Sequence, residues 1–158
     1  MSLPRSFVLE RIGGRRRSVV EHGGALLCVC AYLGPMDGGV DLLGEDGLPA
    51  ATIRGGAMAV RDYHARIGSG ESLRVFGEAP LLVVHSSGRA PTEVVVAEEA
   101  GGRRTLTWRR DGGIDGVLRI VPANGSEPWT LDVPGWEEPL RALAALHAAE
   151  RLLREIEA

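Results

Sequence analysis

The sequence predicts a mainly β domain of roughly ten to twelve short antiparallel strands, forming a barrel or a curled sheet, with one C-terminal helix packed in or on it. Two observations predict this class. The 22 glycines and 9 prolines recur at short intervals, as they do between short strands joined by turns. The one long helical pattern closes the chain, so helices do not alternate with strands, which argues against Rossmann-type and TIM-barrel architectures. We therefore expect residues 1–158 to form a single β-rich domain.

The first strands are separated by glycine pairs. Ser6–Ile12 alternates between apolar and polar residues, Gly13-Gly14 provides a turn, and Ser18–Glu21 follows as a second strand. Ala25–Leu33 is a continuous apolar run bounded by glycine, which indicates a strand that is buried on both faces or crosses the core.

Two cysteines stand two residues apart in this apolar run. On a strand, Cys28 and Cys30 point to the same face, which is a poor geometry for a disulfide. A metal site would need further ligands, and the sequence has no second cysteine pair and no HxxxH motif. We expect two buried thiols and no metal.

The clearest hairpin joins Val40–Leu43 to Ala50–Arg54, because Asp46-Gly47 supplies the positive φ that such a turn needs. Met58–Val60 and Tyr63–Ile67 are interpreted as one bent strand. The remaining predicted strands are Ser72–Phe76, Leu81–His85, Glu93–Ala97, Arg103–Arg109, Gly116–Val121 and Trp129–Val133.

The last stretch, residues 138–157, is predicted to be a helix. Alanine and leucine dominate it, no glycine or proline interrupts its interior, and Pro139 suits a first helical turn. Its first half is apolar nearly all round apart from Arg141 and His147, whereas from Glu150 onward one face is charged. We therefore expect the first half to be enclosed and the second half to emerge with a wet face. The helix is too short and too charged near its end to span a bilayer.

Three stretches together resemble the tubby C-terminal-like superfamily, which includes the phospholipid scramblases and the LURP-one-related proteins. They are Val40–Arg54, VDLLGEDGLPAATIR; Arg74–Pro80 with the LLVV that follows; and the C-terminal helix. The resemblance implies a barrel of about twelve strands around a central C-terminal helix. No position of this sequence matches the lipid-binding basic residues of that superfamily.

Composition excludes several kinds of chemistry. The chain has no lysine, which rules out a P-loop lysine, a Schiff-base lysine and a Ser–Lys dyad. A net charge of −3 and an aromatic content of 4% argue against nucleic acid as a partner. No signal-peptide pattern is present, so we expect a cytoplasmic protein without a transmembrane segment.

Arginine clusters are the main candidates for ligand binding, because guanidinium groups bind phosphate in a bidentate manner. The candidate residues are Arg15, Arg16, Arg17, Arg89, Arg103 and Arg104. Arg89 follows Ser86-Ser87-Gly88, where hydroxyl and backbone N–H groups offer an anion site. An anionic lipid headgroup is therefore one expected partner.

A weaker candidate is a catalytic site at Asp62, His64 and His85, since a carboxylate beside an imidazole orients a base. No serine or cysteine stands in a recognisable nucleophile motif, and a hydrogen-bonded strand histidine is the plainer interpretation. We expect a non-enzymatic binding or scaffold domain without a cofactor. The alternatives are a hydrolase or transferase at the Asp/His site, and a protein-interaction domain that self-associates through an edge strand or an exposed helix face.

Overall fold

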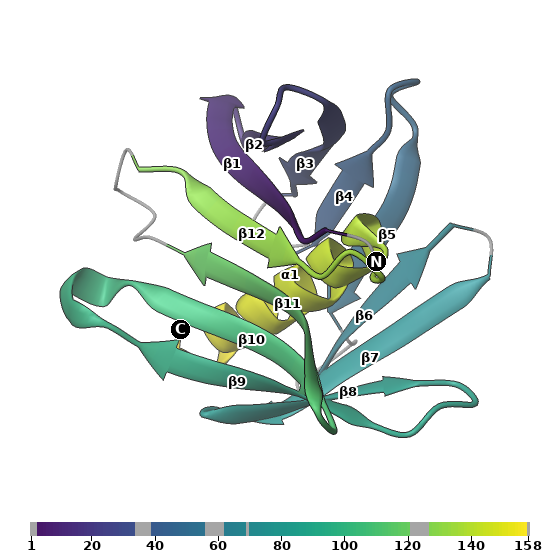
Figure 1. Ribbon diagram of the computed structural model, residues 1–158, viewed down its shortest axis with the longest axis vertical. Helices are drawn as coiled ribbons and strands as arrows, with labels where there is room; N and C mark the ends of the chain where they lie inside the picture. The colour runs from purple at the N-terminus through teal and green to yellow at the C-terminus, as the bar shows by residue number, and fades with distance from the viewer. Residues whose placement is uncertain (1–2, 34–38, 56–61, 69, 121–126, 158) are drawn as a thin grey trace.

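Twelve strands form a closed antiparallel barrel around one helix (Figure 1). The computed structural model describes residues 3–33, 39–55, 62–68, 70–120 and 127–157, with side chains of the last helix described as far as Arg154. The elements are β1 (Arg5–Gly13), β2 (Arg16–Glu21), β3 (Leu26–Tyr32), β4 (Val40–Leu43), β5 (Pro49–Gly55), β6 (Asp62–Ile67), β7 (Glu71–Glu78), β8 (Leu81–Ser86), β9 (Thr92–Glu98), a short 3-10 helix η1 (Ala100–Gly102), β10 (Arg104–Arg110), β11 (Gly113–Ile120), β12 (Trp129–Val133) and α1 (Pro139–Glu157).

Each strand pairs with its neighbours along the chain, and β1 closes the ring by pairing with β12, where Phe7 lies opposite Leu131. The predicted fold class is therefore confirmed, with a barrel rather than a curled sheet. The predicted segment Met58–Val60 lies outside the described residues. The described strands form a closed ring, so none of them has a free edge. This rules out one of the alternatives from the sequence, self-association through an edge strand.

Because all neighbouring strands are antiparallel, the turns alternate between the two ends of the barrel. We call the end at which α1 begins the upper end, and the end at which α1 finishes the lower end. The upper end carries the β8–β9 turn at residues 87–91 and the β10–β11 turn at residues 111–112. The β1–β2 turn and the β9–β10 connection lie at the lower end.

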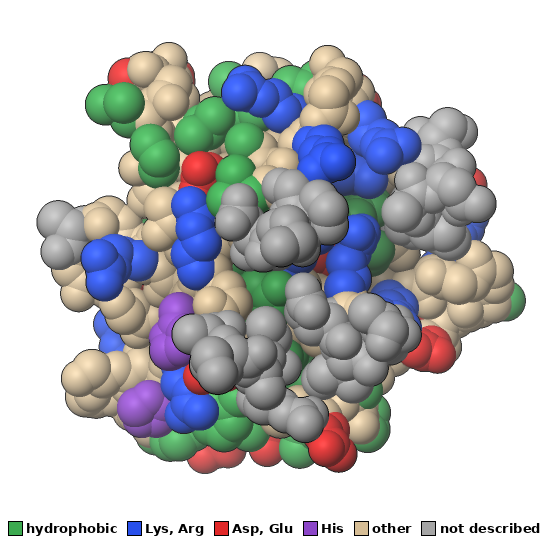
Figure 2. All heavy atoms as spheres, turned by 180° about the vertical axis from the view of Figure 1, so that it is seen from behind, with side chains coloured by type: hydrophobic (Ala, Val, Ile, Leu, Met, Phe, Trp, Pro, Cys, Tyr) green, Lys and Arg blue, Asp and Glu red, His purple; other side chains and the backbone are tan. Residues whose placement is uncertain are grey.

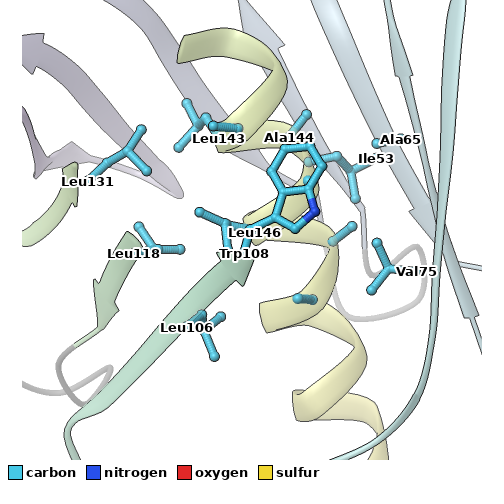
Figure 3. Close-up of a cluster of buried hydrophobic side chains, with 14 of the residues drawn as sticks. Ile53, Ala65, Val75, Leu106, Trp108, Leu118, Leu131, Leu143, Ala144 and Leu146 are labelled. Atoms are coloured by element: carbon cyan, nitrogen blue, oxygen red, sulfur yellow. The ribbon is translucent and has the colours of Figure 1, made fainter. Parts of the chain in front are cut away.

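The helix fills the barrel. Every residue from Arg141 to Glu150 is buried. Figure 3 shows Leu143, Ala144 and Leu146 of α1 among Trp108, Leu118 and other strand side chains that point inward. β11 approaches the helix closely at Gly116, where an added Cβ would lie 3.2 Å from Ala142 Cβ. The first half of α1 is therefore enclosed, as predicted.

The solvent-exposed face of the helix begins further along the chain than the sequence predicts. Glu150 was expected to face water, but it is only 4% exposed, and Leu152 and Leu153 are also buried. The exposed side of the helix is first seen at Arg154. The buried carboxylate of Glu150 is stabilised because it forms ion pairs with Arg151 and Arg154.

Two smaller expectations are also settled. Cys28 and Cys30 are free and buried, as predicted. In the part of the chain that the structure describes, no helix combines the length and the apolar character needed to cross a bilayer.

Candidate functional site

Polar side chains occupy both ends of the filled barrel. At the lower end, Tyr32 of β3 reaches His147 of α1, with 2.9 Å between Tyr32 Oη and His147 Nε2. His147 Nδ1 lies 3.2 Å from the backbone oxygen of Leu143, which can only accept. Nδ1 therefore carries the proton, and Tyr32 donates to Nε2. Burial, followed by the nearby charge of Arg151, lowers the pKa of His147 to about 3, so the imidazole is neutral.

Arg17 of β2 also points into the lower end. Its guanidinium lies 4.1 Å from the ring centre of Trp129, and its Nη1 donates to the backbone oxygen of Leu9 at 3.3 Å. Arg11 lies opposite Arg17 in the β1–β2 pairing. Burial lowers the pKa of Arg17, and the like charge of Arg11 adds to this effect.

The end of α1 completes this group. Arg151 lies 4.8 Å from the ring centre of Tyr32, and its Nε is 3.6 Å from Glu150 Oε2. Glu150 Oε1 accepts a hydrogen bond from Arg154. Glu150 Oε2 and Arg151 Nε are buried without hydrogen-bond partners among the described residues. We call Arg17, Tyr32, Trp129, His147, Glu150 and Arg151 the lower cluster.

The structure divides the arginine triplet that the sequence singled out. Arg15 and Arg16 are exposed, whereas Arg17 is only 5% exposed, because successive side chains on β2 point to opposite faces. Arg15 adjoins the lower cluster, since its backbone oxygen accepts a hydrogen bond of 2.7 Å from the backbone N–H of Tyr32. Of the three candidates, Arg15 and Arg16 therefore lie on the outer rim of the barrel, and the Arg17 side chain points inward.

Arg103 and Arg104 lie at the same end but on β10 and the segment before it. They are separated from β1 by β11 and β12. Arg103 pairs with Glu127 at 2.8 Å and Arg104 with Glu98 at 3.1 Å. These carboxylates offset their charge, so they are weaker candidates for an anion site than Arg15 and Arg16.

An ion-pair network covers the start of α1 at the upper end. Arg141 contacts Glu71 at 2.9 Å and Glu137 at 3.2 Å. Arg110 contacts the buried Asp115 at 2.9 Å and Glu137 at 3.6 Å. Burial raises the pKa of Glu137, although the adjacent Arg141 acts in the opposite direction. The network links β7, β10 and β11 to the helix.

Beside this network lies a cavity of about 1240 Å³ between the β8–β9 and β10–β11 turns. Ser86 and Thr92 contribute hydroxyl groups to its wall, and Thr92 Oγ1 accepts a 2.7 Å hydrogen bond from Trp108 Nε1. Arg89, another of the sequence candidates, lines the same cavity. We call this space the upper cavity.

The Asp/His candidates lie on the outer wall of the barrel. Asp62 Oδ2 is 3.2 Å from His64 Nε2 and 2.7 Å from Arg74 Nε, and the hydrogen bond from Arg74 lowers the pKa of Asp62. His64 and His85 lie opposite Arg74 on either side of β7. Histidine and arginine side chains lie next to one another at the left of the face shown in Figure 2. The three candidates thus come near one another on an exposed surface, and none of them lines the upper cavity.

No metal site is found where the structure describes the chain: no three His, Cys, Asp or Glu residues converge there. The sequence pointed only indirectly to the lower cluster and the upper network. Arg141 and His147 are the two polar residues on the otherwise apolar first half of the helix. Arg141 belongs to the upper network and His147 to the lower cluster, so this departure from the apolar pattern is the sequence signal for both sites. Tyr32 and Trp129 had no such signal, because aromatic residues in strands are ordinary core residues.

Comparisons with known proteins show the fold. No family model matches the chain, and no curated protein matches it significantly. Among solved structures, the chain is similar to the X-ray structure of a protein from Arabidopsis thaliana, with a TM-score of 0.59 and 12% identity over 99% of this chain and 93% of the other. At this identity the similarity extends to the fold and not to the site.

Proposed function

We propose that this protein is a non-enzymatic binding domain of the tubby C-terminal-like type, and that it binds a phosphate-bearing ligand at the lower end of the barrel. The closed barrel around a C-terminal helix supports the membership, because this is the architecture that the sequence resemblance implies. The arginines of the β1–β2 hairpin support the ligand class. We place this function in the cytoplasm, in keeping with the sequence.

One observation carries the proposal. Arg11 and Arg17 lie opposite each other in the β1–β2 pairing, and like charges in that position repel. Arg15 and Arg16 follow in the same hairpin. Among the described residues, none of these four arginines has a carboxylate partner within ion-pair distance. A bound anion would relieve the repulsion and accept the unused N–H groups.

The lower cluster explains why the hairpin holds this arrangement. Trp129 lies under the Arg17 guanidinium, and Tyr32 lies under that of Arg151, so aromatic faces stabilise both cations. Arg154, in the last turn of α1, also offsets the partial negative charge at the end of the helix. The site is therefore preorganised for an anion, with Arg15 and Arg16 as the accessible groups.

The ligand is either a soluble phosphate compound or a phosphorylated lipid headgroup, and two measurements distinguish them. Calorimetry with inorganic pyrophosphate reports soluble binding. Pelleting with phosphatidylcholine vesicles, with and without a phosphatidylinositol phosphate, reports headgroup binding. Either interaction should weaken as salt is added, because exposed charges are screened.

The variant Arg15→Ala/Arg16→Ala tests the site without removing a buried side chain. We expect it to weaken binding by about tenfold or more, since hydrogen bonds to charged groups contribute about 1.5–3 kcal/mol each. Arg66→Ala is the matched control, because Arg66 is exposed on β6 and has no ion-pair partner among the described residues. Equal binding by the double variant and the wild type would refute the site, as would no binding of either probe to the wild type.

A further inference from the structure

The upper cavity is a second candidate ligand site, independent of the arginines at the lower end. Its wall comes from β8, β9, β10 and β11 and from Arg141 of the helix, at the end of the barrel opposite the β1–β2 turn. Its volume of about 1240 Å³ is larger than the roughly 300–1,000 Å³ of typical small-molecule sites, so a small ligand would fill part of it. The two ends of the barrel are separated by the buried middle of α1.

The charges in this wall leave one cation without a counterion. The lining holds four arginines (Arg89, Arg109, Arg110 and Arg141) and three carboxylates (Glu93, Asp111 and Asp115), and Glu71 and Glu137 flank it. Arg109 pairs with Glu93, Arg110 with Asp115, and Arg141 with the flanking Glu71 and Glu137. Among the residues described, Arg89 has no such partner, although it lies in the cavity wall. Arg89 is therefore the arginine of the wall whose charge is available to an anionic ligand.

The rest of the wall is suited to an apolar body. Pro91, Val95 and Ile114 contribute aliphatic surface, and Ile114 is 50% exposed although it begins a strand beside the cavity. The hydroxyl of Ser86 and the backbone of the turn that carries Arg89 are next to this surface. An apolar side chain left exposed in the same wall as an unpaired cation is a combination that an amphipathic ligand would cover.

We propose that the upper cavity binds a small organic acid, with its single anionic group on Arg89 and its apolar body against Pro91, Val95 and Ile114. This site differs from the lower end in ligand class. A phosphate with two charges and no apolar body suits the arginine-rich hairpin, and a monoanion with an apolar body suits the upper cavity. The proposal does not depend on the function proposed for the lower end.

Two fluorescent probes that differ by one group test the proposal. The probe 8-anilino-1-naphthalenesulfonate carries an aromatic body and one sulfonate, and N-phenyl-1-naphthylamine is the same body without the charge. We expect the sulfonate probe to bind the folded wild-type protein at one saturable site. Arg89→Ala should weaken this binding by about tenfold, the value of one charge-assisted hydrogen bond, and should change the affinity for the uncharged probe by less than about twofold.

Two further variants make the result specific. Ile114→Glu should weaken the binding of both probes, because it places a carboxylate on the apolar wall. Arg66→Ala, which removes an exposed arginine outside both candidate sites, should leave both affinities unchanged. Near-ultraviolet circular dichroism checks that each variant is folded. The proposal is overturned if neither probe binds the folded wild type, or if Arg89→Ala leaves the affinity for the sulfonate probe intact or lowers both affinities equally.

Discussion

Tyr32 and His147 are joined by a 2.9 Å hydrogen bond inside the barrel, between a strand of the first half and the only α-helix described. Burial raises the pKa of Tyr32 well above its usual range, so the phenol stays protonated and donates. His147 accepts at Nε2 and uses its Nδ1–H on the backbone of Leu143. Both ring nitrogens are therefore satisfied while the ring is fully enclosed.

Tyr32→Phe should destabilise the protein by about 1–3 kcal/mol, because it leaves His147 Nε2 buried without a donor. The free energy of unfolding in urea measures this cost. In a double-mutant cycle with His147→Phe, the pair should show a coupling energy of about 1 kcal/mol or more. Additive effects of the two substitutions would mean that this hydrogen bond contributes nothing to stability.

His147 should also make stability depend on pH. Its pKa falls from 6.5 in the unfolded chain to about 3 in the folded protein, so between these values the unfolded chain binds the extra proton. The stabilisation is complete above about pH 6.5 and is lost as pH falls toward 3, by up to about 1.4 kcal/mol per pH unit. Urea unfolding at a series of pH values from neutral downward measures this slope.

His147→Gln should flatten that pH dependence, because glutamine cannot be protonated and still has a polar group for Tyr32. The carboxylates of the protein contribute equally to both curves, so the difference isolates His147. His85→Gln is the control, since His85 is exposed on the outer wall. Parallel curves for the wild type and His147→Gln would exclude this role.

Gly116→Ala should destabilise the barrel by about 1–3 kcal/mol, as overpacking of a core does. The new Cβ would lie 3.2 Å from Ala142 Cβ and 3.3 Å from Leu146 Cδ1, so the helix must move away from β11. Gly113→Ala is the matched control on the same strand, because no atom lies within 4 Å of its added Cβ. Thermal unfolding of the two variants compares them, and similar melting temperatures would contradict the close approach.

Arg141→Met should cost about 3–5 kcal/mol, because it leaves the buried Glu137 with only the more distant Arg110. Adding Glu137→Gln to this variant should recover part of the loss by removing the unpaired charge. Arg103→Met breaks the exposed pair with Glu127 and should cost less than about 1 kcal/mol. Urea unfolding distinguishes the two sites, and equal losses would show that burial of the ion pair is unimportant.

The fold was largely predictable because its signals are local. Glycine turns mark most strands, and the hairpin at Asp46-Gly47 has the expected geometry, with Gly47 at φ +79° and a hydrogen bond from the Leu48 backbone to Asp46. Whether the sheet closes was not predictable, since the pairing of β1 with β12 joins residues from opposite ends of the sequence.

The candidate sites were less predictable, because they are built from residues that are far apart in the chain. Glu150 was predicted to lie on a solvent-exposed helix face. The sequence could not show that Arg17 and Tyr32, from distant strands, lie near it together with Arg151 and Arg154. The alternation rule could have shown that Arg16 and Arg17 point to opposite sides of β2. Ser86 and Arg89 were sequence candidates for an anion site, but the cavity that they line was not predictable, since it depends on how two distant turns lie beside the helix.

The enclosed helix has a consequence for how the protein is made. On the ribosome, β1 is complete long before its partner β12 and the helix emerge. Until then, the inward faces of Leu42, Ile53 and Val75 have no α1 to pack against, and the first strand has one neighbour instead of two. The nascent chain therefore exposes apolar surface and an unpaired strand edge until β12 and α1 have been synthesised, and such surfaces are prone to aggregation.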